Sequence, residues 1–196
     1  MLTEVILFLA AIMLAQQPTV ANERDVQRVA MEGWVAARAL APKGGALELL
    51  GPVNVKLREL DRMANKSARY AEVAIRAAVS AAQEERDEMQ LFLEHARDLA
   101  RQMELAGTTA QYPLPIDELE GELWFEVDRF DDAKAAYARA VAAKPTVNAL
   151  IGLARANDRL GDVIGACAAY TRARGTPGLP STVELEISLY ALKCSY

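Results

Sequence analysis

The single histidine is the first residue to consider for metal or acid–base chemistry. His95 follows Glu94 directly and lies three residues before Asp98. A di-metal Glu-x-x-His motif needs a carboxylate at position 92, which is occupied by Phe92. With one histidine and two cysteines, the chain also lacks the ligands for a His-rich centre or a Cys-rich zinc module. We expect His95 to lie on a helix surface and the chain to bind no metal and no cofactor.

Three glutamates form the other arrangement that could do chemistry. Glu118, Glu122 and Glu126 recur at every fourth position, so a helix would present them in one row. The row is either a surface for a cation or a basic peptide, or an ordinary solvated helix face. The sequence has no nucleophile-elbow, phosphate-binding or dinucleotide-binding motif. We therefore predict a non-catalytic protein, and a metal-dependent enzyme that uses the acidic helix face is the weakest alternative.

The composition favours a helical protein of one domain or a short repeat array. Of 196 residues, 37 are alanine, 11 glycine and 8 proline, and alanine both favours helices and lets their axes approach closely. No segment shows the alternating β-branched pattern of a strand. The net charge is −5 and no basic stripe is present, so nucleic-acid binding is not expected. The predicted fold class is all-α.

Residues 1–21 are typical of a signal peptide. Their apolar run, residues 5–15, has the length of a signal-peptide core but is short for a membrane-spanning helix. Thr19 and Ala21 are small residues at the positions required for cleavage after Ala21, whereas Glu4 and the lack of a basic side chain are unusual for an export signal. We expect export to a bacterial periplasm or envelope. The alternatives are an uncleaved anchor, which would be the chain's only membrane attachment, or an apolar helix packed on a cytoplasmic protein.

The rest of the chain divides into helical segments separated by turn signals. Residues 22–53 comprise a helix up to residue 41, a Pro/Gly break at residues 42–45 and a second turn at Gly51 and Pro52. Helical periodicity fills residues 54–106, with a break at residues 65–67. Within it, residues 68–106 form either one long helix or two shorter ones. Residues 107–115 are a loop.

A period of 33 residues relates the helices of residues 116–196. Stepping by this period aligns Ala133 with Ala166, Tyr137 with Tyr170, Ala140 with Ala173, and Trp124 with Asn157 and Tyr190. Ala133, Tyr137 and Ala140 share one helix face, which gives a small–large–small packing surface, and Pro145 ends that helix. This segment resembles a tetratricopeptide repeat (TPR) protein. The resemblance implies antiparallel helix-turn-helix hairpins stacked as a short α-solenoid, and an unrelated Ala-rich helical bundle is the alternative.

The repeat pattern is degenerate. It departs from the family at Glu120, Asp128 and Asn157, where a large apolar residue, glycine and an aromatic residue are usual. The second unit turns at residues 160–162. Residues 181–193 are expected to form a terminal capping helix, in which Ser181 and Glu184 predict a capping box. Residues 54–106 are either further, decayed repeats or an unrelated helical segment.

The resemblance also implies a scaffold for protein–protein interaction. In TPR proteins the first helices of successive units line a concave groove that receives a peptide or protein partner. Carried over to this chain, the groove residues are Glu118, Glu122, Phe125, Glu126, Asn148, Ile151, Arg155, Arg159, Glu184 and Ser188. We expect apolar anchors near Phe125 and Ile151. The alternative is a cytoplasmic TPR-type chaperone or adaptor whose N-terminal apolar helix belongs to the fold.

The repeat geometry also implies a relation between the two cysteines. Cys167 lies early in the second helix of the second unit, and Cys194 lies at the end of the following antiparallel helix. These two ends are neighbours in a TPR arrangement, so a disulfide is sterically possible and would suit an exported protein. Two independent buried thiols are the alternative.

Overall fold

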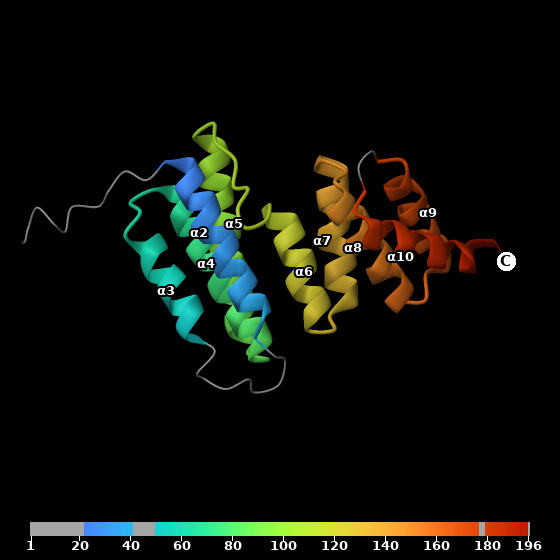
Figure 1. Ribbon diagram of the computed structural model, residues 1–196, viewed down its shortest axis with the longest axis horizontal. Helices are drawn as coiled ribbons and strands as arrows, with labels where there is room; N and C mark the ends of the chain where they lie inside the picture. The colour runs from blue at the N-terminus through green and yellow to red at the C-terminus, as the bar shows by residue number, and fades with distance from the viewer. Residues whose placement is uncertain (1–21, 41–49, 177–178, 196) are drawn as a thin grey trace, which may run out of the picture.

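The computed structural model describes residues 22–40, 50–176 and 179–195, and over these residues the chain is all-α with no strand (Figure 1). Residues 1–21, on which the signal-peptide prediction rests, lie outside the described residues. The helices are α2 (Glu23–Arg38), α3 (Leu50–Asp61), α4 (Lys66–Ala82), α5 (Arg86–Leu105), α6 (Ile116–Glu126), α7 (Phe130–Ala143), α8 (Val147–Arg159), α9 (Val163–Arg174) and α10 (Ser181–Ala191). A short 3-10 helix, η2 (Lys193–Ser195), follows α10.

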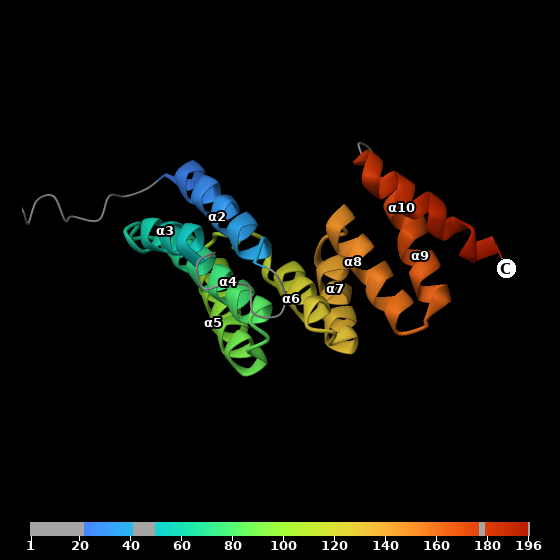
Figure 2. The same ribbon diagram turned by 60° about the horizontal axis from the view of Figure 1, so that its bottom comes forward.

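The helices follow one another along the long axis of the molecule, with α2–α5 at one end and α8–α10 at the other (Figures 1 and 2). From α2 to α10 each helix packs against the next, while α2 also packs on α4, α4 on α6 and α6 on α8. One buried apolar cluster extends from α2 to α6 and a second from α7 to α10. The even-numbered helices α2, α4, α6 and α8 are therefore neighbours in turn, and Arg38 of α2 reaches the side chains of α6.

Three helix pairs, α4–α5, α6–α7 and α8–α9, turn in the same way. Each turn has one residue with a left-handed backbone: Glu84 (φ 61°), Asp128 (φ 60°) and Gly161 (φ 77°). The next residue donates its amide hydrogen to the carbonyl five positions earlier, always at 2.9 Å: Glu85 to Ser80, Arg129 to Trp124 and Asp162 to Asn157. Asp128, where the TPR proteins that the sequence resembles usually have glycine, thus has the backbone that glycine adopts most easily.

Counting from these turns brings the three pairs into register. In the second helix of each pair, the residues 5, 9 and 12 positions after the left-handed residue are all buried: Met89, Leu93 and Ala96; Ala133, Tyr137 and Ala140; Ala166, Tyr170 and Ala173. Seven positions before the turn, each first helix has a small buried residue: Ala77, Gly121 and Ala154. A small residue there lets the two helices of a pair approach closely.

Several predicted boundaries are corrected by the structure. Gly51 and Pro52 lie in the first turn of α3 rather than in a separate turn, because proline needs no intrahelical hydrogen-bond acceptor at that position. The boundary at residues 53 and 54 therefore falls inside a helix. Residues 68–106 are two helices, since the chain reverses at residues 83–85 without a glycine or proline. Residues 107–115 are a loop, as expected.

The capping box predicted at the start of the last helix is wrong. The N-cap of α10 is Pro180, and no side chain caps this end. Ser181 is already the first helical residue, so its hydroxyl is one position too late to accept from the third amide of the helix.

Candidate functional site

A cavity of about 280 Å³ opens between α2, α6, α8 and α10. It brings together five of the predicted groove residues: Glu118, Glu122, Asn148, Ile151 and Arg155. Its other walls come from residues that the sequence did not single out for the groove: Trp34, Leu114, Tyr137, Gly152 and Val183. In Figure 2, α2 and α10 lie toward the same side of the molecule, with α6 and α8 between them along the long axis. We call this cavity the groove cavity.

Tyr137 forms the floor of the groove cavity, and two glycines make room for it. A Cβ atom at Gly121 of α6 would lie 2.7 Å from the Tyr137 ring, and one at Gly152 of α8 would lie 2.2 Å from it. The ring is therefore held between α6 and α8, and its hydroxyl donates to Glu122 Oε2 at 2.8 Å. Burial, together with the Glu122 charge, raises the pKa of the Tyr137 hydroxyl, so Tyr137 acts as a neutral hydrogen-bond donor.

The acidic row of α6 is partly neutralised by the chain itself. Arg38 of α2 pairs with Glu122, at 3.0 Å, and with Glu126. The same guanidinium lies over the Trp34 ring, 5.7 Å from its centroid. Two of the three carboxylates in the row thus have a cationic partner, and that partner comes from a helix 84 residues or more away in the sequence.

Glu118 differs from the other two glutamates of the row. It is only 6% exposed, and its Oε1 accepts a hydrogen bond of 2.8 Å from the Thr146 hydroxyl. Among the described residues it forms no ion pair, and its Oε2 has no hydrogen-bond partner. Burial raises the pKa of the Glu118 carboxyl, an effect that the Thr146 hydrogen bond and the more distant Lys144 charge oppose. The groove cavity therefore contains a buried carboxylate whose charge no described cation pairs.

Arg155 is the positively charged side chain that lines the groove cavity, and it forms an ion pair with Glu186 of α10. Its guanidinium donates two hydrogen bonds to Glu186, at 2.8 and 2.6 Å, and Tyr170 donates a third to the same carboxylate. The Arg155 guanidinium is the main reason why the pKa of Glu186 lies below its ordinary value. A ligand in the cavity thus meets Arg155 as one half of an existing ion pair.

The remaining predicted groove residues lie outside the groove cavity. Phe125 packs edge-on against Phe130, with 5.3 Å between ring centroids, and Arg159 lies 4.2 Å from the Phe130 centroid, so these side chains form a cluster at the α6–α7 turn. Glu126 is paired with Arg38. Glu184 and Ser188 are exposed on α10, where the Ser188 hydroxyl donates to the Glu184 carbonyl; the α10 residue that lines the cavity is Val183. Neighbouring residues of a helix point about 100° apart, which explains why Val183 lines the cavity and the predicted Glu184 does not.

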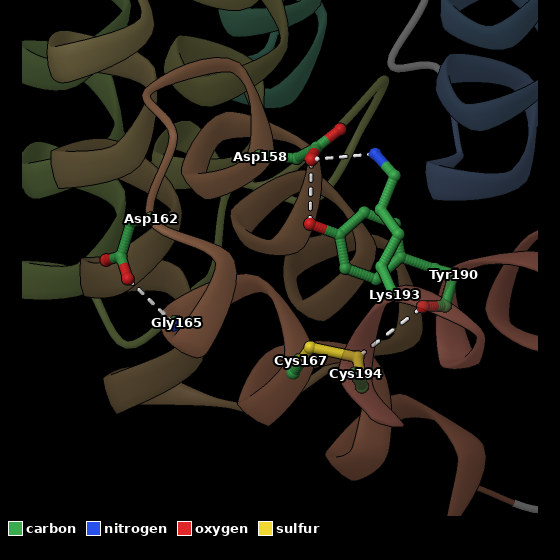
Figure 3. Close-up of a disulfide and its surroundings, with 7 residues drawn as sticks. All are labelled: Asp158, Asp162, Gly165, Cys167, Tyr190, Lys193 and Cys194. Carbon is green, nitrogen blue, oxygen red and sulfur yellow. Dashed lines mark hydrogen bonds and ion pairs between the residues drawn. A yellow bond between two sulfur atoms is a disulfide. The ribbon is translucent and has the colours of Figure 1, made fainter. Parts of the chain in front are cut away.

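A disulfide attaches the C-terminal end of the chain to α9. Cys167 of α9 is bonded to Cys194 of η2, with 5.8 Å between their Cα atoms (Figure 3). Beside it, the Tyr190 hydroxyl donates to Asp158 at 2.7 Å and Lys193 pairs with the same carboxylate at 3.3 Å. These contacts hold α10 against α8 and α9, and so keep Val183 at the wall of the groove cavity and Glu186 beside Arg155.

A larger cavity, of about 800 Å³, lies beside the loop that joins α5 to α6. Its charged walls include Arg97 of α5, which pairs with Asp117 at 2.8 Å and with Glu120 at 2.6 Å. Arg139 of α7 pairs with the same two carboxylates, which explains why Glu120 is tolerated where the repeat pattern has an apolar residue. The network joins α5, α6 and α7. Glu118, Lys144 and Thr146 line this cavity too, so Glu118 borders both the larger cavity and the groove cavity.

Neither a metal centre nor a membrane span emerges from the described residues. Over residues 22–40, 50–176 and 179–195 there is no group of three or more metal-binding side chains, and His95 is exposed on α5. Within the same ranges no helix is both long and apolar enough to cross a bilayer. The chain has no significant match among protein-family models, curated proteins or solved structures. The absence of catalytic and cofactor-binding residues stays a prediction.

Proposed function

We propose that this protein is a non-catalytic interaction scaffold that binds a polypeptide segment of a partner in the groove cavity. The observation that carries the proposal is the meeting of Glu118, Glu122, Asn148, Ile151 and Arg155 in one cavity. These residues come from α6 and α8, the first helices of two successive pairs. First helices that line a common groove are what the resemblance to TPR proteins implies.

The shared turns support a TPR-like stack that is longer than the sequence pattern indicates. The α4–α5 pair has the same left-handed turn residue and the same buried positions as α6–α7 and α8–α9. We therefore assign residues 66–105 as a further, decayed repeat. The left-handed turn residues of the three pairs, Glu84, Asp128 and Gly161, are 44 and then 33 residues apart. The first interval is longer because it contains the loop at residues 106–115.

The walls of the groove cavity suit a peptide ligand. Apolar contact is available from Trp34, Ile151 and Val183, and directed polar contact from Asn148 and Glu118. Asn148 is exposed and its amide is able both to donate and to accept, which is the capacity needed to bond a peptide backbone. Concave sites of this kind gain affinity from apolar burial and specificity from a few polar groups.

Binding of peptide pools by two matched arginine variants would test the proposal. Asn148→Arg adds a bulky side chain at the wall of the groove cavity, whereas Leu91→Arg adds the same side chain on α5, where Leu91 is 65% exposed. We expect fluorescently labelled heptapeptide pools to bind the unmodified protein and Leu91→Arg equally, and Asn148→Arg at least tenfold more weakly. Equal binding by both variants, or no binding of any pool, would refute the groove as the binding site.

Export is the second part of the proposal. It is supported by the apolar run of residues 5–15 and by the Cys167–Cys194 disulfide, since disulfides persist in oxidising compartments. Intact mass of the protein from envelope and cytoplasmic fractions, with and without reduction and alkylation, tests it. The expected result is a chain that lacks residues 1–21 and takes up alkylating reagent only after reduction. A full-length cytosolic chain with two free thiols would favour the cytoplasmic adaptor.

A further inference from the structure

Glu118 is the residue of the groove cavity that points most directly to a ligand chemistry. Glu122 and Glu126 of the same helix, and Glu186 beside Arg155, are each paired with an arginine of the chain. Glu118 is buried to the same degree as a core residue, at 6% exposure, yet among the described residues only the neutral hydroxyl of Thr146 donates a hydrogen bond to it and no cation forms an ion pair with it. A buried charge without a counter-charge is costly in a folded protein. A cation supplied from outside would remove that cost.

We infer that the partner segment bound in the groove cavity inserts a lysine side chain whose ammonium group pairs with Glu118; this inference rests on the proposed function. The lysine stem would lie against Ile151 and Leu114, which line the same cavity. A lysine can bury its methylene stem on apolar walls while its charged end reaches a carboxylate. The cavity, about 280 Å³ in volume, has room for one such side chain.

A lysine makes a smaller demand on the Glu118 carboxylate than an arginine does. Thr146 donates to Oε1, and no described residue donates to Oε2. An arginine fork pairs best with both carboxylate oxygens, so at Glu118 it would share Oε1 with the Thr146 hydroxyl, as Arg155 shares Glu186 Oε1 with Tyr170. An ammonium group is a point charge and needs only one oxygen. The chain's own arginine, Arg38, is taken up by the next two carboxylates of the row and does not reach Glu118 in the contacts of the described residues.

The test compares four heptapeptide pools that differ only at the central residue: lysine, arginine, norleucine or glutamate. The proteins are the unmodified full chain, Glu118→Gln and Glu184→Gln. Both variants remove one negative charge, but Glu184 is exposed on α10 outside the cavity, so the pair separates local contact from net charge. Glutamine keeps an acceptor for the Thr146 hydroxyl.

For the unmodified protein and Glu184→Gln we expect the lysine pool to bind on the order of tenfold more tightly than the norleucine pool. In Glu118→Gln this ratio should fall to about one. A lysine preference that survives in Glu118→Gln, or an arginine pool that binds more tightly than the lysine pool, overturns the inference. If all pools bind equally and Asn148→Arg weakens every one, the groove stands and the lysine assignment fails. If no pool binds, the proposed function fails as well.

A second measurement needs no substitution. In methyl NMR spectra of the unmodified protein, Nα-acetyl-lysine methylamide should shift the Ile151 methyl signals, whereas the norleucine analogue at the same concentration should not. Equal shifts from both compounds would show that the ammonium group has no partner in the cavity and would overturn the inference.

Discussion

Replacing Gly152 with alanine should both weaken the fold and disturb the groove cavity. The new Cβ would lie 2.2 Å from Cζ and 2.3 Å from Cε1 of Tyr137. The ring is 4% exposed, forms the floor of the groove cavity and is bonded to Glu122 through its hydroxyl, so a shift away from the new Cβ disturbs that hydrogen bond or the cavity. Overpacking costs about 1–3 kcal/mol, and so close an approach belongs near the upper end. Alanine recovers about 1 kcal/mol of helix propensity, which leaves a net loss of about 2 kcal/mol.

Urea unfolding measures the free energy of unfolding, and the same substitution in a Tyr137→Leu background serves as the control. In a Tyr137→Leu background the ring is gone, and Gly152→Ala should then stabilise by about 1 kcal/mol. The reasoning would be refuted if Gly152→Ala left the unmodified chain as stable as before. It would equally be refuted if the loss of about 2 kcal/mol persisted in the Tyr137→Leu background.

Three more outcomes are expected. Cys194→Ser removes a cross-link to Cys167 over a sequence separation of 27 residues. Loop-closure entropy predicts that the free energy of unfolding, measured with urea, falls by roughly 3.5 kcal/mol. Unmodified protein that is equally stable with and without reductant would contradict this prediction. Because the pKa of Glu186 is held below its ordinary 4.5 by Arg155, its contribution to stability is complete above that value and is lost as the pH falls through the lowered pKa. Stability curves between pH 6 and 2 should therefore be less steep for Glu186→Gln, and identical slopes would argue against the pair. Leu189 is 60% exposed, so Leu189→Lys should change the unfolding free energy by less than about 0.5 kcal/mol; a loss of several times that amount would mean that this face of α10 is covered in solution.

The repeat pattern alone predicted most of the residues by which α6 and α8 line the groove cavity. Asn148, Ile151 and Arg155 recur at three- and four-residue spacing, as do Glu118 and Glu122, and such spacing determines which side chains share a helix face. It does not determine the direction of that face to within one residue. This is why α10 contributes Val183 to the cavity rather than its neighbour Glu184.

The turns show a second limit of local reasoning. A left-handed backbone could be predicted at Gly161 because glycine adopts it easily, whereas Glu84 and Asp128 have the same conformation although they are not glycine. Their strain is offset by the packing of the helices on either side, which involves residues far from the turn. The sequence therefore indicated the pair around Gly161 clearly and left residues 68–106 open between one helix and two.

By itself the sequence determined the all-α class, most of the helix ends, the loop at residues 107–115 and the row of glutamates on α6, because helix propensity, periodicity and breakers act within a few residues. Only the tertiary structure decided which of those glutamates forms no ion pair with a described residue. Arg38 reaches Glu122 across 84 residues of sequence, and Trp34 reaches the same cavity as Ile151. Such meetings depend on how whole helices pack, and no local pattern encodes that packing.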